Sequence, residues 1–338
     1  MIKYYRPIVI FLFGAFCSAY SYSQHYQFSQ FYSAPTYLNP AFTGANVCSR
    51  LSMTYRDQWP SIPGTFVSYQ VSFDHSLQSV NSGIGLLFFT DKAGSGSLKT
   101  TQASLLYAYE YQIARHIMGR VGFSGGFVGR SIDYASLLFG DQIARGGASS
   151  SVEKINNGTS YMDFGTGALF YTNNAWFGFT FTHLTNPNQA IMHEAVADLP
   201  REFKMHGGYK FSLSENKDNQ KTQKGNSFLT VAFNYKKQLE FDQTDAGFYY
   251  TKSPITFGLW YRGIPLLKAY KKGYQNNDAV VFLAGISIDR LNVGYSYDLT
   301  ISQLAPHSGG SHEVSIKYQF CELKKVRRKP IVIYCPKF

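Results

Sequence analysis

The sequence has few charged residues and, after its first 23 residues, no long apolar run. Asp, Glu, Lys and Arg together make up 16% of the 338 residues, whereas soluble globular domains carry roughly 25%. No stretch beyond residue 23 approaches the roughly 20 consecutive apolar residues that a transmembrane helix needs. These two absences argue against an ordinary soluble enzyme and against a helical membrane protein.

Cysteine is also scarce, with four in the whole chain. Three of them follow residue 23, namely Cys48, Cys321 and Cys335, and an odd number leaves at least one outside any intramolecular disulfide. No CxxC or HxxxH spacing accompanies them, so they do not indicate a metal site. In an oxidising compartment we expect a disulfide between Cys321 and Cys335 that closes the C-terminal tail.

The signatures of catalysis are missing as well. There is no GxSxG nucleophile motif. Ser311, His312 and Glu313 are adjacent, and on a strand adjacent side chains point to opposite faces, so they do not form a triad with one another. The glycine-rich stretch 122–129 lies on an expected strand without a following helix, which excludes a phosphate-binding loop. We therefore predict no enzyme, no catalytic residue, no cofactor and no metal.

Aromatic residues and an export signal are what the chain does contain. Phe, Tyr and Trp make up 17% of the residues, with 28 Phe and 26 Tyr beside 30 Gly. Residues 1–23 carry Lys3 and Arg6, then an apolar run over residues 8–16, and end in small residues at Ser21 and Ser23. This pattern is typical of a secretory signal peptide, and we predict cleavage after Ser23.

Strict alternation of apolar and polar residues runs through most of the mature chain. Leu51, Met53 and Tyr55 share one face of an expected strand, and Arg56 lies on the other. Fourteen segments follow this pattern, at residues 51–56, 65–74, 83–90, 98–113, 119–130, 159–171, 175–183, 204–213, 227–238, 245–252, 254–262, 280–288, 292–299 and 312–320. The polar face is rich in Ser, Thr, Gln and Gly rather than in the Lys and Glu that the outer face of a soluble β-sandwich would show. We therefore predict an all-β fold, a transmembrane antiparallel β-barrel of about 14 strands over residues 51–320.

The connections between these segments support the barrel. If the chain starts in the periplasm, the external connections 131–158, 184–201, 263–279 and 300–311 are long, as expected for outer-membrane barrels. The periplasmic turns 114–118, 172–174, 253 and 289–291 are short, and residues 214–226 are the one long exception. This orientation makes residues 24–50 a periplasmic N-terminal segment and residues 321–338 a basic periplasmic tail.

The stretch 27–44, QFSQFYSAPTYLNPAFTG, precedes the first alternating segment. Pro35 and Pro40 prevent a long helix, and five aromatic residues give the segment apolar surface with which to pack. We expect the segment either to plug the lumen of the barrel or to dock a periplasmic partner. With four further strings it resembles the PorP/SprF family: the strings are YRDQW at 55–59, GYSYD at 294–298, HEV at 312–314 and CPKF at 335–338. They span the mature chain from its first strand to its last residue.

The resemblance implies an outer-membrane component of the type IX secretion and gliding machinery. Members of this family help to deliver or anchor a secreted, adhesin-type partner that carries a C-terminal targeting domain. The expected partners are that secreted protein, type IX or gliding components and outer-membrane lipid, but not nucleic acid. The alternative that the residues leave open is a passive or hydrophobe-selective outer-membrane channel, since a lumen lined by Ser, Thr, Gln and Gly suits water.

Two sets of residues are candidates for partner binding. The net charge of +11 falls to +9 (11 minus 2) when Lys3 and Arg6 leave with the signal peptide, and much of it lies in the tail, where an acidic partner or anionic headgroups would bind. The candidates are Phe28, Phe31, Tyr32, Tyr37, Asn39 and Phe42 in the N-terminal segment, and Lys324, Lys325, Arg327 and Arg328 in the tail.

Three charged residues on the polar face have a structural interpretation instead. The first and last strands become neighbours when a barrel closes. Arg56 on the first strand is then within reach of Glu313 or Asp298. We expect an ion pair in the lumen that holds the register of this seam.

Overall fold

The computed structural model describes residues 26–64, 66–134, 137, 140–147, 158–192, 195–213, 227–264, 269–271 and 274–321. The predicted signal peptide and most of the predicted tail therefore lie outside the described residues. Within them no helix is both long and apolar enough to cross a membrane.

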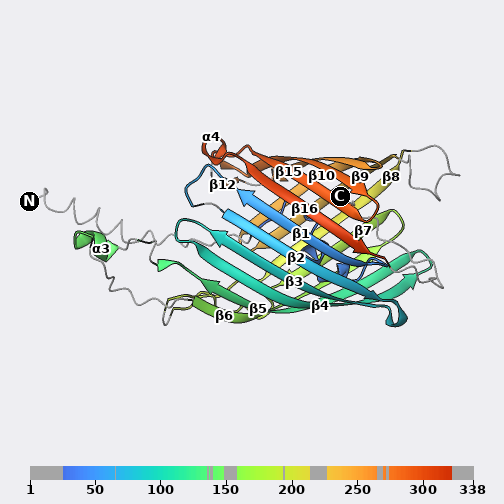
Figure 1. The fold of residues 1–338 in the computed structure, drawn as a ribbon, viewed down its shortest axis with the longest axis horizontal. Coiled ribbons are helices and arrows are strands. Elements are labelled where there is room, and N and C mark those ends of the chain that lie inside the picture. The colour runs from blue at the N-terminus through green and yellow to red at the C-terminus, as the bar shows by residue number, and fades with distance from the viewer. Residues whose placement is uncertain are drawn as a thin grey trace, which may run out of the picture.

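A closed antiparallel barrel of 14 strands makes up the body of the molecule (Figure 1). This confirms the predicted fold class, and the closed ring excludes the β-sandwich. The strands are β1 (Ser49–Gln58), β2 (Phe66–Leu77), β3 (Ser82–Ala93), β4 (Leu98–Ala114), β5 (Ile117–Ser131), β6 (Gly158–Tyr171), β7 (Ala175–Thr182), β8 (Glu202–Ser212), β9 (Ser227–Gln238), β10 (Phe241–Lys252), β11 (Ile255–Gly263), β14 (Asn277–Ile288), β15 (Leu291–Thr300) and β16 (Ser311–Phe320).

Closure joins the first strand to the last. β1 pairs with β2 on one side and with β16 on the other, and in the second pairing Arg56 lies opposite Glu313. Each predicted segment coincides with one strand, but most strands are longer than predicted. β3, for example, extends to Ala93 because its ladder with β4 continues to Leu98. Hydrogen bonding between neighbours thus carries the strands past the end of the alternating pattern.

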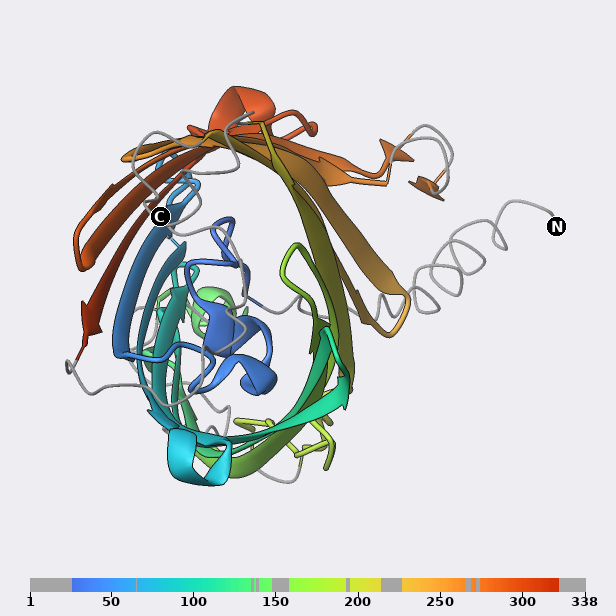
Figure 2. The same ribbon diagram turned by 90° about the vertical axis from the view of Figure 1, so that its right-hand side faces the viewer.

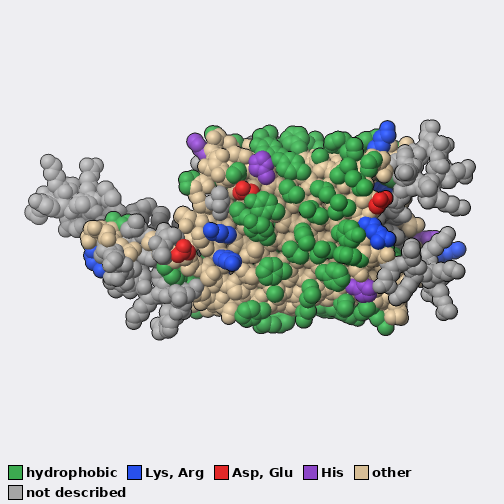
Figure 3. Space-filling model, viewed as in Figure 1, with side chains coloured by type: hydrophobic (Ala, Val, Ile, Leu, Met, Phe, Trp, Pro, Cys, Tyr) green, Lys and Arg blue, Asp and Glu red, His purple; other side chains and the backbone are tan. Residues whose placement is uncertain are grey.

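The two faces of the wall differ as the alternation predicted. Large apolar side chains such as Leu105, Phe123 and Phe257 are exposed on the outer face, and Figure 3 shows apolar side chains covering the middle of the wall, with most charged side chains toward its two ends. The inner face carries buried polar residues, among them Ser52, Gln70 and Thr230. An apolar outer band with a polar interior is typical of outer-membrane barrels.

The two ends of the barrel differ in the length of their connections. At the end where β1 begins and β16 finishes, here called the short-turn end, turns such as 172–174 and 253–254 join the strands. At the opposite end, the long-loop end, the connections include residues 132–157, 183–201 and 264–276, with α3 (Gly140–Ala144), α4 (Ala305–Ser308) and the small β12 (Ala269–Lys271) and β13 (Tyr274–Gln275) sheet. The exception at 213–226 joins β8 to β9 at the short-turn end.

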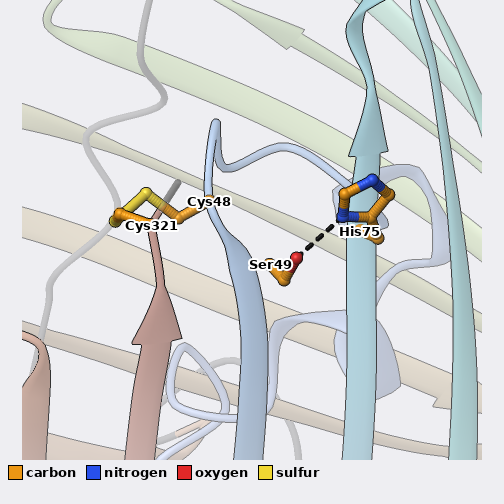
Figure 4. Close-up of a disulfide and its surroundings, with 4 residues drawn as sticks. All are labelled: Cys48, Ser49, His75 and Cys321. Carbon is orange, nitrogen blue, oxygen red and sulfur yellow. Dashed lines mark hydrogen bonds between the residues drawn. A yellow bond between two sulfur atoms is a disulfide. The ribbon is translucent and has the colours of Figure 1, made fainter. Parts of the chain in front are cut away.

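A disulfide closes the seam at the short-turn end (Figure 4). Cys48, just before β1, bonds to Cys321, just after β16, and their Cα atoms are 4.6 Å apart. The predicted pairing of Cys321 with Cys335 is therefore wrong. Closure of the barrel places Ser49 opposite Phe320. The neighbouring residues Cys48 and Cys321 therefore meet, although they are 273 positions apart in the sequence. The prediction failed because it paired cysteines that are close along the chain.

Candidate functional site

The N-terminal segment lies inside the barrel and occupies its lumen. Figure 2 looks along the barrel and shows this segment, in blue, enclosed by the ring of strands. Residues 26–45, here called the plug, include Tyr32, Asn39 and Phe42, each at most 2% exposed. The plug lies against the lumen wall because its aromatic side chains pack on that wall.

Two prolines shape the plug into short turns instead of a continuous helix. Pro35 begins α2 (Pro35–Leu38) and Pro40 begins the 3₁₀ turn η1 (Pro40–Phe42). Proline is tolerated at the first helical position because the missing N–H has no partner there. Between the two turns, the Asn39 side chain accepts a hydrogen bond from the Ala41 backbone N–H at 2.9 Å and so caps η1.

Five charged side chains on the lumen wall, here called the charged cluster, hold the beginning of the plug. Arg56 lies 2.8 Å from Asp298 and 3.1 Å from Glu313, and these are the three residues predicted to pair in the lumen. Arg262 lies 2.8 Å from both Asp298 and Asp245. All five side chains are buried, and buried charges of this kind require partners for every group.

Ser29 of the plug completes this cluster. Its hydroxyl accepts hydrogen bonds from Arg56 at 2.6 Å and from Arg262 at 2.7 Å, and it donates one to Asp298 at 2.6 Å. A hydroxyl has one donor and two acceptor sites, so all three are used. The Ser29 backbone N–H donates to Glu313 at 2.7 Å.

Gln30 extends the attachment along β16 and β15. Its backbone N–H donates to Glu313 at 2.9 Å, and its side-chain amide donates to Ser296 on β15 and to the Glu313 carbonyl. Ser315 donates to the Gln30 side-chain oxygen at 2.6 Å. The cluster contains three carboxylates but only two guanidinium groups. The backbone N–H groups of Ser29 and Gln30 donate the additional hydrogen bonds that Glu313 accepts.

An aromatic group fixes the middle of the plug. The Phe31 ring meets Trp260 edge-on at 4.8 Å between centroids, and the Tyr32 ring meets Trp176 edge-on at 5.5 Å. The Tyr32 hydroxyl donates to the Gly207 carbonyl at 3.2 Å. Edge-to-face aromatic pairs at these distances are favourable, so the plug is held by apolar packing as well as by charge.

The plug's Asn39 also binds the opposite part of the wall. Its amide nitrogen lies 3.0 Å from the Ala168 carbonyl and 3.2 Å from the Phe179 carbonyl. His206 lies 3.2 Å away and stacks on Phe42. Asn39 is the first residue of the Asn-Pro-Ala-Phe sequence at residues 39–42, and its contacts hold this turn of the plug against β6 and β7.

The end of the plug is held by two arginines near the short-turn end. Arg120 donates to the backbone carbonyls of Ala41 at 2.9 Å and Thr43 at 2.5 Å. Arg50 pairs with Asp74 at 2.8 Å, and Asp74 accepts the backbone N–H of Gly44 at 2.8 Å. These charged side chains bind backbone atoms of the plug, and every residue has those atoms. The contacts therefore require no particular side chain in the plug and cannot be recognised as a sequence motif.

Glycine on the wall gives the plug room to approach. A Cβ atom on Gly122 of β5 would overlap the backbone of Pro40 and Ala41. Gly44 itself has a φ of +64°, a conformation that favours glycine. The close neighbour of Gly122 is therefore the backbone of the plug.

A small cavity remains between the plug and the wall. It has a volume of about 40 Å³ and is lined by Tyr37, Asp163, His183 and Lys204 among others. That volume accommodates a few water molecules.

The structure places the N-terminal candidate residues in the lumen (Figure 2), which is one of the two alternatives expected for this segment. Five of the six N-terminal candidates are buried in the lumen and Tyr37 is half-buried, so they contact the barrel. Lys324, Lys325, Arg327 and Arg328 lie outside the described residues. No group of three metal-binding side chains occurs in the part of the chain that the structure describes.

Several residues of the site were not predicted. Arg120 and Arg262 could have been found, because each is an arginine on the polar face of an alternating strand, as Arg56 is. Ser29 and Gln30 carry no such signal. Their role depends on the path of the plug through the lumen, which local sequence does not specify.

A family model for the type IX secretion system membrane protein PorP/SprF matches residues 20–318. The chain belongs to the PorP/SprF family. This confirms the resemblance, and the match includes the whole plug and nearly the whole barrel. The protein is thus a type IX secretion membrane component with an outer-membrane type of barrel.

Solved structures similar to this PorP/SprF protein are outer-membrane barrels of low sequence identity. A mutant of the TodX monoaromatic hydrocarbon channel is 11% identical, covering 88% of this chain and 94% of that one, with a TM-score of 0.44. Omp33 of Acinetobacter baumannii is 6% identical, covering 82% and 100%, with a TM-score of 0.42. A mutant porin of Rh. blastica is 10% identical, covering 80% and 99%, with a TM-score of 0.34. No curated protein matches the chain significantly.

Proposed function

We propose that this PorP/SprF protein holds a secreted partner at the cell surface through the long-loop end of its barrel, as part of type IX secretion. In outer-membrane barrels the longer connections face the cell exterior, which makes the long-loop end the outer one. The partner is a secreted, adhesin-type protein with a C-terminal targeting domain. The plug supports an anchoring role over conduction because it occupies the lumen through which solutes would pass.

The observation that carries the proposal is the exposure of large apolar side chains on the connections at the long-loop end. Exposed apolar groups outside the lipid-facing strands are typical of protein interaction sites. Val196 is 77% exposed, the highest value among the large apolar side chains of the described residues. Among the described residues, others on the connections at this end are Ile143 (66%), Met192 (51%), Leu239 (45%), Leu304 (43%) and Ile301 (40%).

The test is recovery of the partner with the tagged protein after gentle detergent extraction of its own outer membrane, followed by mass spectrometry. We expect a large secreted protein with a C-terminal targeting domain, together with type IX components. Recovery of the barrel alone, at good yield and with a crosslinker present, would contradict anchoring and favour the passive or hydrophobe-selective channel.

A matched pair of variants locates the binding end. Val196→Asp places a charge on the long-loop end, and Val80→Asp places the same charge on an equally small exposed residue, 56% exposed, at the short-turn end. We expect Val196→Asp to reduce recovery of the secreted partner and Val80→Asp to leave it unchanged. The reverse pattern would move the binding site to the other end of the barrel.

The basic tail is the second proposed contact and faces the periplasmic side. Its residues Lys324, Lys325, Arg327 and Arg328 would attract an acidic type IX component or anionic headgroups. Charge reversal of these four should weaken that association more at low than at high salt, because salt screens exposed charges. A loss that is independent of salt would remove electrostatic attraction as the cause.

A further inference from the structure

The two ends of the plug lie at opposite ends of the barrel. At the C-terminal end of the plug, Arg120 binds the backbone of Thr43 and Asp74 binds the backbone of Gly44. Arg120 is the fourth residue of β5, which starts at the short-turn end with Ile117. From there the chain passes through Cys48 into β1. The last residues of the plug therefore leave the lumen at the short-turn end.

The first residues of the plug lie toward the long-loop end. The Tyr26 ring packs on Phe89 at 4.3 Å between centroids, and Phe89 lies near the end of β3, which finishes at Ala93. The Gln27 side chain accepts a hydrogen bond from Lys236 at 2.8 Å, and β9 finishes two residues later, at Gln238. Both strands finish at the long-loop end.

The contacts with β16 give the direction of the chain between these points. This strand starts at Ser311, at the long-loop end, and finishes at Phe320. Ser29 binds Glu313, Gln30 binds Ser315 and the Tyr32 carbonyl accepts a hydrogen bond from Lys317 at 3.5 Å. Successive plug residues therefore advance along β16 toward the short-turn end.

From this path we propose that the mature N-terminus leaves the lumen at the long-loop end and is exposed at the cell surface beside the external loops. This inference replaces the expectation that residues 24–50 form a periplasmic segment. It rests on the proposed function only for which end of the barrel faces outward. The described start of the plug, at Tyr26 and Gln27, then lies close to the surface that a secreted partner meets, and the plug links that region through Ser29 to the charged cluster.

The test is labelling of single cysteines on intact cells with a membrane-impermeant maleimide. The background is Cys335→Ser, since Cys48 and Cys321 are joined in a disulfide. The reporter is Gln24→Cys, and a chain with a Gly-Cys-Gly insertion between His25 and Tyr26 serves as a second reporter if the first alters signal-peptide cleavage. We expect both reporters to be labelled on intact cells. Labelling of both only after the outer membrane is permeabilised would overturn the proposal.

Two further cysteines establish the orientation independently. Ala197→Cys is exposed on the 183–201 connection at the long-loop end, and Asn173→Cys is exposed in the 172–174 turn at the short-turn end. We expect labelling of Ala197→Cys and no labelling of Asn173→Cys on intact cells. If Asn173→Cys alone is labelled, the orientation in the proposed function is wrong. If Ala197→Cys is labelled but neither reporter is, the threading proposal fails while the orientation stands.

Discussion

The backbone N–H of Ser29 donates a hydrogen bond to the Glu313 carboxylate at 2.7 Å, across 284 positions of sequence. Through this bond the plug and the last strand share one carboxylate with Arg56, which lies opposite Glu313 in the seam. Attachment of the plug and closure of the barrel therefore depend on the same side chain. Disturbing one should disturb the other.

Glu313→Ala should destabilise the folded barrel by about 3–5 kcal/mol, the usual effect of removing one partner of a buried ion pair. The change leaves Asp298 as the carboxylate paired with Arg56 and removes the acceptor of two plug N–H groups. Chemical unfolding of the purified protein in detergent measures the effect. The control is Ser52→Ala, on the lumen face of β1, whose buried hydroxyl makes no hydrogen bond within the described part of the chain, so its removal should cost much less than that of Glu313. Equal effects of the two substitutions would contradict a special role for Glu313.

Gly122→Ala should displace the plug, because its Cβ atom would overlap the backbone of Pro40 and Ala41. We expect a cost of about 1–3 kcal/mol, as for other overpacked sites, and faster proteolysis within residues 26–45. Gly129→Ala on the same strand is the control, since a Cβ atom there has no neighbour within 4 Å. In a chain that lacks residues 27–44, Gly122→Ala should become harmless. If Gly122→Ala still lowers stability in that shortened chain, its Cβ atom must overlap something other than the plug.

Cys48→Ser should lower stability under oxidising conditions by about 2–4 kcal/mol, because the disulfide closes a long loop in the unfolded chain. Cys321→Ser should have the same effect, whereas Cys335→Ser should leave the disulfide and the stability unchanged. Unfolding of the three variants, with thiol titration of each, measures this. A free thiol at Cys48 in the unmodified protein would disprove the pairing.

Deletion of residues 27–44 should raise the conductance of the barrel in planar bilayers, because the plug contacts the lumen wall on several sides. The unmodified protein should conduct little. The control is the Cys335→Ser chain, in which the plug is intact and the conductance should stay at the unmodified level. A steady, open pore in the unmodified protein would contradict a plugged lumen and support the channel alternative.

Much of the fold could be predicted from the alternation of residue types. The period of two depends only on the geometry of a strand, so 14 segments could be located one at a time and Arg56, Asp298 and Glu313 could be assigned to the inner face. The strand ends were less predictable, since β3 and its neighbours continue for as long as their ladders do. The family resemblance, carried by short strings along the chain, was confirmed by the match to residues 20–318.

The sequence by itself determined the class of fold, the faces of the strands and the seam that brings Arg56 to Glu313, because each follows from periodicity and from closure of a ring. Only the tertiary structure decided that Cys48 bonds to Cys321, that Arg262 joins the cluster and that the aromatic segment enters the lumen. Many of these contacts join residues far apart in the sequence, by 273 positions for Cys48 and Cys321 and by 79 for Arg120 and Ala41. Several of them, as in the bonds from Arg120 to Ala41 and Thr43, are made to backbone atoms that every residue carries. Which backbone enters the lumen is decided by the packing of the whole barrel and not by any local string.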